Sequence, residues 1–210
     1  MYKMLLFFVD SLLYFYPCKF SLNSLIIYLF NLIIYNDNKT LSISMIYQTE
    51  RLIIRKLKTS DIDAFHEMQG NPNVMQYTDG KTKTYDEDVI DLQQVIDYYH
   101  KSNNEFWVWA VELKGNNEFL GIIAHIKDDE GNDEIGYRFL EKHWNNGYAF
   151  ESMMGLIAYC KKLGIKELVA MVIIKNGASE HIIKKAGFKF VKEYLCEDLK
   201  LPERMYKLVL

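Results

Sequence analysis

The residues best suited to chemistry stand in one short stretch, "EKHWNNGYAFESM", which runs from Glu141 to Met153. A tryptophan and two asparagines lead into Gly147, and a run with helical character follows. A helix that begins near Gly147 would direct free backbone N–H groups, and the positive end of its dipole, at the preceding loop. Because Gly147 has no side chain and Ala149 a small one, a diphosphate could approach this backbone closely. The same letters also describe an ordinary turn before a helix, so the stretch alone leaves both interpretations open.

Other chemical signatures are missing from the sequence. It contains no G-x-S-x-G, no P-loop and no H-E-x-x-H, so hydrolase, NTPase and metalloprotease functions have no support. The five histidines lack the spacing of metal ligands, and we expect no metal. A net charge of −3 without a basic block argues against nucleic-acid binding. Three cysteines, odd in number and far apart, indicate free thiols in a reducing cytoplasm.

The first part of the chain, residues 1–44, is a hydrophobic N-terminal extension without any Gly, Ala, Glu or Arg. Its uncharged run of 17 residues has Asn23 and Asn31 in its interior and is shorter than the roughly 20 apolar residues that span a membrane. Three interpretations stay open: a membrane-associated segment, an additional helical layer, and a translated leader before a natural start at Met45. We favour the leader, because such a composition is what A/T-rich, non-selected sequence encodes.

From Met45 onward, strand and helix patterns alternate without long linkers. The patterns predict strands over 51–57, 106–113, 119–126, 134–140, 167–173, 189–195 and 205–210. They predict helices over 60–68, 84–99, 147–164 and 176–188, with "NPN" at 71–73 as a break. This order predicts one α+β domain over residues 45–210, built around a single mixed sheet.

In this context the opening stretch carries a family resemblance. "W-N-N-G-Y-A-F-E-S" resembles the loop "W-G-K-G-Y-A-T-E-A" of the ribosomal-protein N-acetyltransferase (Rim-like) branch of the GNAT-type N-acetyltransferases. Asn145 replaces a common glycine, and Asn146 replaces a common lysine, which removes one charge near the phosphates. "N-G-A-S-E-H-I-I-K-K-A-G-F" is similar to that branch's "N-x-x-S-x-x-x-x-x-K-x-G-F", and "TERLIIRKLKTSDIDAF" to its opening strand and first helix. The matching blocks occur in the right order and cover residues 49–210.

The resemblance implies a fold and a co-substrate. The expected fold is a central mixed, mostly antiparallel sheet, flanked by about four helices and splayed between the fourth and fifth strands. The co-substrate is acetyl-CoA. Its pantetheine arm would pair with the exposed backbone of the strand that ends at Phe139 and Leu140, and Asn176 would reach the same arm while it caps its own helix. The diphosphate would lie on the loop, whose residues are Asn145, Asn146, Gly147, Tyr148 and Ala149.

The resemblance also implies acyl transfer to an amine by direct attack in a ternary complex. Glu134 stands where related enzymes often keep a catalytic glutamate, although it could equally be a solvated charge at a strand end. Many members use a tyrosine as the acid four residues before the glycine of the Gly-Phe pair, but Ile183 occupies that position here. The Rim-like branch keeps a serine near the thioester sulfur at the position of Ser179, so the resemblance implies Ser179 as the acid. A local first-turn hydrogen bond is its alternative role.

Several classes of amine are possible acceptors. A protein N-terminus, a polyamine, an amino acid or another small amine would each suit the fold. A non-catalytic acyl-CoA-binding module is the alternative function, since the usual tyrosine and lysine are both replaced. We expect a cytoplasmic monomer or homodimer that binds no nucleic acid, with membrane contact only if residues 1–44 are translated.

Overall fold

The structure is a computed structural model that describes residues 45–210. The three interpretations of residues 1–44 fall outside this described part. Within it, none of the helices combines the length and apolar character needed to cross a membrane.

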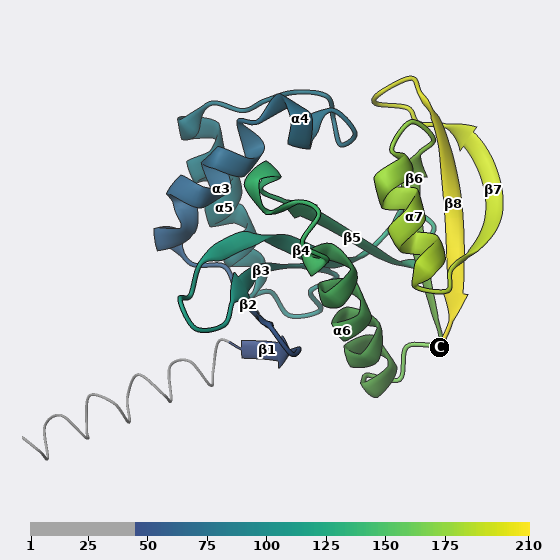
Figure 1. The fold of residues 1–210 in the computed structure, drawn as a ribbon, viewed down its shortest axis with the longest axis horizontal. Coiled ribbons are helices and arrows are strands. Elements are labelled where there is room, and N and C mark those ends of the chain that lie inside the picture. Colours follow the sequence, from purple (N-terminus) through teal and green to yellow (C-terminus); the bar gives the residue numbers. More distant parts are fainter. Residues whose placement is uncertain (1–44) are drawn as a thin grey trace, which may run out of the picture. The chain divides into compact units, whose positions relative to one another are not determined.

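One eight-stranded sheet forms the centre of the described domain, in the order β1-β2-β3-β4-β5-β6-β8-β7 (Figure 1). The strands are β1 (Met45–Gln48), β2 (Leu52–Lys56), β3 (Phe106–Leu113), β4 (Phe119–Lys127), β5 (Asp133–Phe139), β6 (Glu167–Ile173), β7 (Lys189–Leu195) and β8 (Pro202–Val209). Every neighbouring pair is antiparallel except β5 and β6. Hairpins join β1 to β2, β3 to β4 and β4 to β5, and β2 pairs with β3, so the first five strands form an antiparallel unit.

The joint between β5 and β6 is the irregular point of the sheet. These two parallel strands pair at one position only, Glu134 with Val169, and then diverge. They are the fourth and fifth strands of the sequence prediction, because β1 was not predicted and shifts the count by one. The expected splayed, mostly antiparallel α+β sheet is therefore confirmed.

Helices cover both faces of the sheet. They are α3 (Ile62–Gln69), α4 (Pro72–Met75), α5 (Tyr85–Tyr98), α6 (Tyr148–Lys162) and α7 (Gly177–Lys185). Neighbouring side chains on β5 point to opposite faces: Tyr137 reaches Ser179 of α7, and Arg138 reaches Gln69 of α3. The α7 side of β5 is thus opposite to the side that α3 covers. Glu134 and Gly136 share the second face with Arg138.

Two short elements were not predicted. The "NPN" sequence follows the end of α3 at Gln69, as predicted, but it also starts the new helix α4. Asn71 accepts a hydrogen bond from the N–H of Asn73, and Pro72 occupies the first helical position. The other element is β1, which packs closely against α6. A Cβ on Gly155 would come within 2.6 Å of Tyr47 and 2.7 Å of Thr49, so a glycine is needed for this approach.

Candidate active site

The loop before α6 presents backbone N–H groups without a side-chain cap. Asn145 and Gly147 both have left-handed backbone conformations, with φ of 62° and 78°. The first helical hydrogen bond runs from the N–H of Glu151 to the carbonyl of Gly147 at 3.0 Å, so the three N–H groups between them precede it. Side chains cap α5 and α7 but not α6. This N-terminus can therefore accept an external anion.

Asn145 has a structural reason to replace glycine. A residue at φ near +60° pays a steric cost unless it is glycine or, to a lesser extent, asparagine. The amide of Asn146 then holds the loop from within, because Nδ2 donates to the carbonyls of His143 at 3.2 Å and Trp144 at 3.0 Å. Both asparagines thus shape the loop.

Arg51 brings a positive charge to the same loop from the start of β2. Its Nη1 donates to the carbonyl of Asn146 at 3.1 Å, and its guanidinium carbon lies 4.6 Å from the centre of the Tyr148 ring. Glu151 holds it in place with Oε2 2.6 Å from Nε, while Thr49 donates to the other carboxylate oxygen at 2.6 Å. These hydrogen bonds and the arginine lower the pKa of Glu151 against the effect of burial. Arg51 thus supplies a positive charge near the loop, where Asn146 replaces the lysine that is common in the Rim-like branch.

The edge of β5 beyond Glu134 lacks a strand partner on the β6 side. The N–H of Leu140 donates to the carbonyl of Leu120 on the β4 side at 2.9 Å. Because hydrogen-bonded and non-bonded pairs alternate in an antiparallel ladder, Tyr137 and Phe139 direct their backbone groups the other way. The carbonyl of Phe139 already accepts from the indole of Trp144 at 2.9 Å. Backbone groups of Tyr137 and the N–H of Phe139 remain for an extended ligand.

The predicted cofactor residues at the end of β5 thus differ in what they offer. The side chains of Phe139 and Leu140 are buried. The Leu140 carbonyl accepts from the N–H of His143 at 2.9 Å, so both of its backbone groups are used inside the protein. Leu140 can only support the site, whereas Phe139 presents one N–H to it.

Hydroxyl groups of β5 and α7 meet on one face of the joint. The Tyr137 hydroxyl donates to Oγ of Ser179 at 3.1 Å. The N–H of Ser179 donates to the side-chain oxygen of Asn176, also at 3.1 Å, so Asn176 is the helix cap that the sequence predicted. Ile183 lies in the core one turn further on. Burial raises the pKa of Tyr137, and the bond to Ser179 opposes this rise.

Glu134 lies on the opposite face of β5 from Tyr137. Burial, followed by the nearby charges of Asp128 and Glu203, raises its pKa to about 7. A carboxyl group with this pKa can accept a proton near neutral pH. Two residues further along the same face, a Cβ on Gly136 would meet no atom within 4 Å. The base candidate therefore borders open space.

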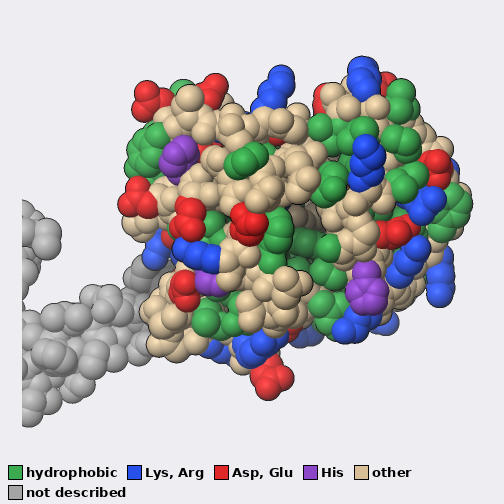
Figure 2. Space-filling model, turned by 45° about the horizontal axis from the view of Figure 1, so that its top comes forward, with side chains coloured by type: hydrophobic (Ala, Val, Ile, Leu, Met, Phe, Trp, Pro, Cys, Tyr) green, Lys and Arg blue, Asp and Glu red, His purple; other side chains and the backbone are tan. Residues whose placement is uncertain are grey.

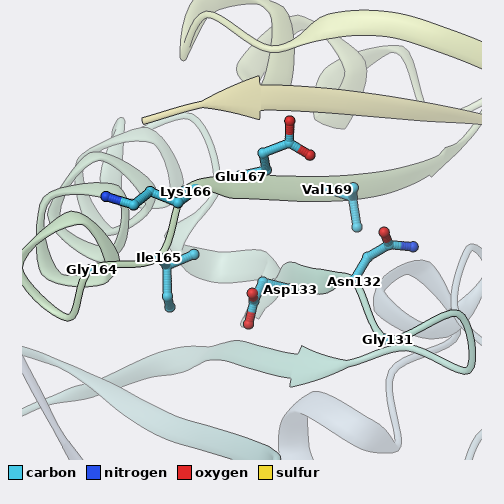
Figure 3. A pocket seen from close by; sticks show the side chains of 8 residues that line it. All are labelled: Gly131, Asn132, Asp133, Gly164, Ile165, Lys166, Glu167 and Val169. Carbon is cyan, nitrogen blue, oxygen red and sulfur yellow. The ribbon is translucent and has the colours of Figure 1, made fainter.

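Figure 2 shows the molecule hollowed between the part that contains β5 and α6 and the part that contains α7, with hydrophobic side chains around the hollow. A separate hollow of about 450 Å³ lies at the other ends of β5 and β6, and its lining includes Asn132, Asp133 and Lys166 (Figure 3). Asp133 there is already bonded to His125 at 2.8 Å and Lys127 at 2.9 Å. The loop before α6 therefore lies at the opposite end of β5 from this second hollow.

Comparison with known proteins identifies the family. The model of the acetyltransferase (GNAT) domain family matches residues 51–189, and the chain belongs to this family. It is accordingly an acyltransferase enzyme, as the sequence predicted. The uncharacterized N-acetyltransferase YoaA of Bacillus subtilis is 27% identical over 147 residues, which cover 69% of this chain and 82% of YoaA.

Solved structures agree with this assignment. An acetyltransferase (GNAT family) from Bacillus anthracis superposes with a TM-score of 0.67 at 25% identity, over 77% of this chain and 96% of that one. RimL, a ribosomal L7/L12 alpha-N-protein acetyltransferase solved with coenzyme A, gives a TM-score of 0.69 at 18% identity, over 79% and 98%. The likeness to RimL shows a shared fold, in line with the resemblance seen in the sequence.

Three residues with a place at the site were not predicted: Arg51, Tyr137 and Arg138. Tyr137 could have been found from strand alternation, which puts it opposite Glu134 and next to the splayed edge. Arg51 carries no such signal, because its partner Glu151 is 100 residues away in the sequence. Arg138 was visible only as one of three charged residues on β5, beside Asp133 and Glu134.

Proposed function

We propose that this chain transfers an acetyl group from acetyl-CoA to a primary amine, by direct attack in a ternary complex. The observation that carries the proposal is the placement of the uncapped α6 N-terminus at the end of the unpaired edge of β5. A single ligand could place an anionic group at the N-terminus of α6 and an extended, amide-bearing arm along the edge of β5. Coenzyme A has both parts, and RimL was solved with it.

Each part of the co-substrate has a place in this arrangement. The diphosphate would lie on the N–H groups of Tyr148 and Ala149, close to the charge of Arg51. The amides of the pantetheine arm would pair with the backbone of Tyr137 and the N–H of Phe139. The thioester would then reach the part of β5 where Glu134 and Tyr137 point to opposite faces.

The residues on these two faces supply the proton transfers. Glu134 takes the proton that the amine loses as its nitrogen bonds to the thioester carbon. A backbone N–H of β5 would stabilise the oxyanion of the tetrahedral intermediate. When the C–S bond breaks, Ser179 gives its hydroxyl proton to the departing thiolate. Tyr137 donates to Ser179 Oγ, which leaves the serine proton free for the sulfur. Tyr137 can then pass its own proton to the serine and take one up from water.

The acceptor class remains a primary amine of a protein N-terminus, a polyamine or another small amine. RimL acts on a protein N-terminus, as its name states. The coarser function, acetyl transfer, does not depend on this choice. We further propose a cytoplasmic location, a monomer or homodimer, and no metal requirement.

A calorimetric titration tests the co-substrate site directly. Acetyl-CoA is titrated into the full chain and into Gly147→Trp, Asn176→Ala and the control Gly164→Trp. Gly164 also has a positive φ, 83°, and a Cβ there meets no atom within 4 Å, so the control introduces the same backbone strain at the other end of α6. We expect binding to be lost in Gly147→Trp, weakened in Asn176→Ala and kept in Gly164→Trp.

Thiol release with a panel of amines completes the experiment. Binding together with amine-dependent release supports transfer, whereas binding without any turnover would leave only the acyl-CoA-binding module. A folded wild-type protein that does not bind acetyl-CoA would contradict the proposal.

A further inference from the structure

The four arginines of the chain fall into two groups by their partners. Three of them form ion pairs with carboxylates, at 2.6 to 3.1 Å. The pairs are Arg51 with Glu151, Arg55 with Asp61 and Glu112, and Arg204 with Glu180 and Glu193. Arg138 has no carboxylate within 4.0 Å among residues 45–210. A charge removed from water is normally paired, so this guanidinium is an exception.

The contacts of Arg138 leave one edge of its guanidinium free. Nη1 donates to Oε1 of Gln69 at the end of α3 and lies 3.7 Å from the sulfur of Met75 on α4. Within the described part of the chain, Nε and Nη2 have no hydrogen-bond partner. These two nitrogens form the fork that binds a carboxylate through two parallel hydrogen bonds.

Nearby acidic residues do not form an ion pair with the guanidinium of Arg138. Asp79, Asp91 and Asp88 favour the charged arginine from a distance, yet burial outweighs them and lowers the pKa of Arg138. Each of these carboxylates has a partner of its own: Asp88 bonds to His66 at 2.7 Å, Asp91 to Lys83, and Asp79 to the N–H of Lys81 at 3.1 Å. An additional anion would therefore offset the desolvation that the protein leaves uncompensated.

Arg138 shares its strand face with the candidate base. Glu134, Gly136 and Arg138 alternate along β5, so the charge lies on the order of 13 Å from Glu134 along the strand backbone. Open space above Gly136 separates the two side chains. The side chain of Arg138 is partly exposed, so a ligand can reach it.

Two connecting loops of the described domain come into contact with each other. A Cβ on Gly80, in the segment after α4, would come within 3.0 Å of a methyl carbon of Leu199, in the β7–β8 connection. Figure 1 shows these two connections approaching each other above the joint of the sheet. This contact between two loops leaves less room for a folded protein chain than for a small acceptor.

We propose that Arg138 binds a carboxylate of the acceptor, and that the acceptor is an amine with a carboxylate, namely an amino acid or a short peptide. The free Nε and Nη2 edge would hold the carboxylate while the amine lies near Glu134. This inference rests on the proposed acetyl transfer and narrows its acceptor class. It makes Arg138 a specificity-determining residue.

Matched acceptors test the proposal without depending on any one substrate. Thiol release is measured for amino acids and dipeptides, each beside its C-terminal amide, with wild type, Arg138→Gln, Arg138→Lys and the control Lys161→Gln. Lys161 is an exposed residue at the end of α6, so its replacement removes the same charge far from the cleft. Acetyl-CoA binding is titrated for all four proteins.

We expect wild type and Lys161→Gln to favour the free acid at least tenfold in kcat/KM. Arg138→Gln should lose this preference through a rise in KM for the acid, with acetyl-CoA binding unchanged, and Arg138→Lys should keep part of it. The proposal is overturned if wild type transfers equally well to the amides, or if the preference survives in Arg138→Gln. If Arg138→Gln does not fold, the wild-type comparison and Arg138→Lys decide.

The two levels of inference can be told apart in these data. Acetyl-CoA binding and transfer to amines without a preference for acids would leave the proposed function standing and remove only the role of Arg138. Failure of wild type to bind acetyl-CoA would remove both.

Discussion

The hydroxyl of Tyr137 on β5 donates to Oγ of Ser179 on α7 at 3.1 Å, and so connects the two sides of the splayed joint. Because Ser179 Oγ accepts in this bond, its own proton is not used between the two hydroxyls. Neither residue alone provides this arrangement, since Ser179 Oγ could otherwise bond to its own helix.

Tyr137→Phe therefore tests the acid. We expect kcat to fall about tenfold, with little change in KM for acetyl-CoA, because the interaction acts when the thiolate leaves. Ser179→Ala should lose more, and the double variant should be no worse than Ser179→Ala. Steady-state rates of the three variants check this, and fully additive losses would show that the hydroxyls act independently.

As the proposed base, Glu134 is expected to make activity depend on pH. Because its pKa is raised to about 7, the proton-accepting form increases as pH rises through 7. With an acceptor whose amine has a low pKa, kcat/KM should rise from pH 6 to 8. Glu134→Gln should be slower and lose this step. A profile of the same shape in the variant would assign the titration to another group.

The same group affects stability with the opposite sign. The folded protein retains a proton on Glu134 that the unfolded chain releases nearer its ordinary pKa of 4.5. Stability is therefore lost as pH rises from about 4.5 through 7. Glu134→Gln should melt above wild type at pH 8, and the difference should shrink at pH 4, as thermal unfolding would show. Glu197→Gln, which changes an exposed glutamate, should show no such crossover.

Arg51 is expected to matter for the co-substrate more than for catalysis. Arg51→Gln removes a charge and the hydrogen bond to the Asn146 carbonyl, so Kd for acetyl-CoA should rise about tenfold and depend less on salt. Lys142→Gln, which removes an exposed charge from the 3-10 helix η2 (Glu141–His143), is the control. Equal losses in both variants would indicate a general charge effect.

The conformation of Asn145 gives a prediction about stability. Asn145→Ala should cost about 1–2 kcal/mol, since alanine lacks the polar side chain that tolerates left-handed φ. Asn145→Gly should be tolerated without such a loss. Urea unfolding of both variants measures the difference, and equal midpoints would mean that the loop relaxes freely.

Strand and helix patterns were sufficient to predict most of the fold. The predicted range of β7, 189–195, is the observed one. The site loop was also predictable, because glycine and helix-start signals are local. The short elements β1 and α4 gave too few residues for a periodic signal, and Pro72 can either start or end a helix.

The features of the site that the sequence did not predict depend on residues far apart in the chain. The pairing of Tyr137 with Ser179 depends on how far β5 and β6 diverge, and this geometry is set by the whole sheet. The raised pKa of Glu134 likewise depends on Glu203, which approaches through β8. The sequence predicted Glu134 and Ser179 at the site but not Tyr137, and only the structure provides their partners.

The single rung between β5 and β6 also has a consequence for the order of folding. The strands β1 to β5 and the strands β6 to β8 each pair antiparallel within their own segment, so each half can close through contacts of comparatively short sequence separation. The parallel rung requires the whole α6 connection first. We expect pulse-labelled amide exchange to find both halves protected before the joint, which would make the catalytic slot the last part of the sheet to assemble.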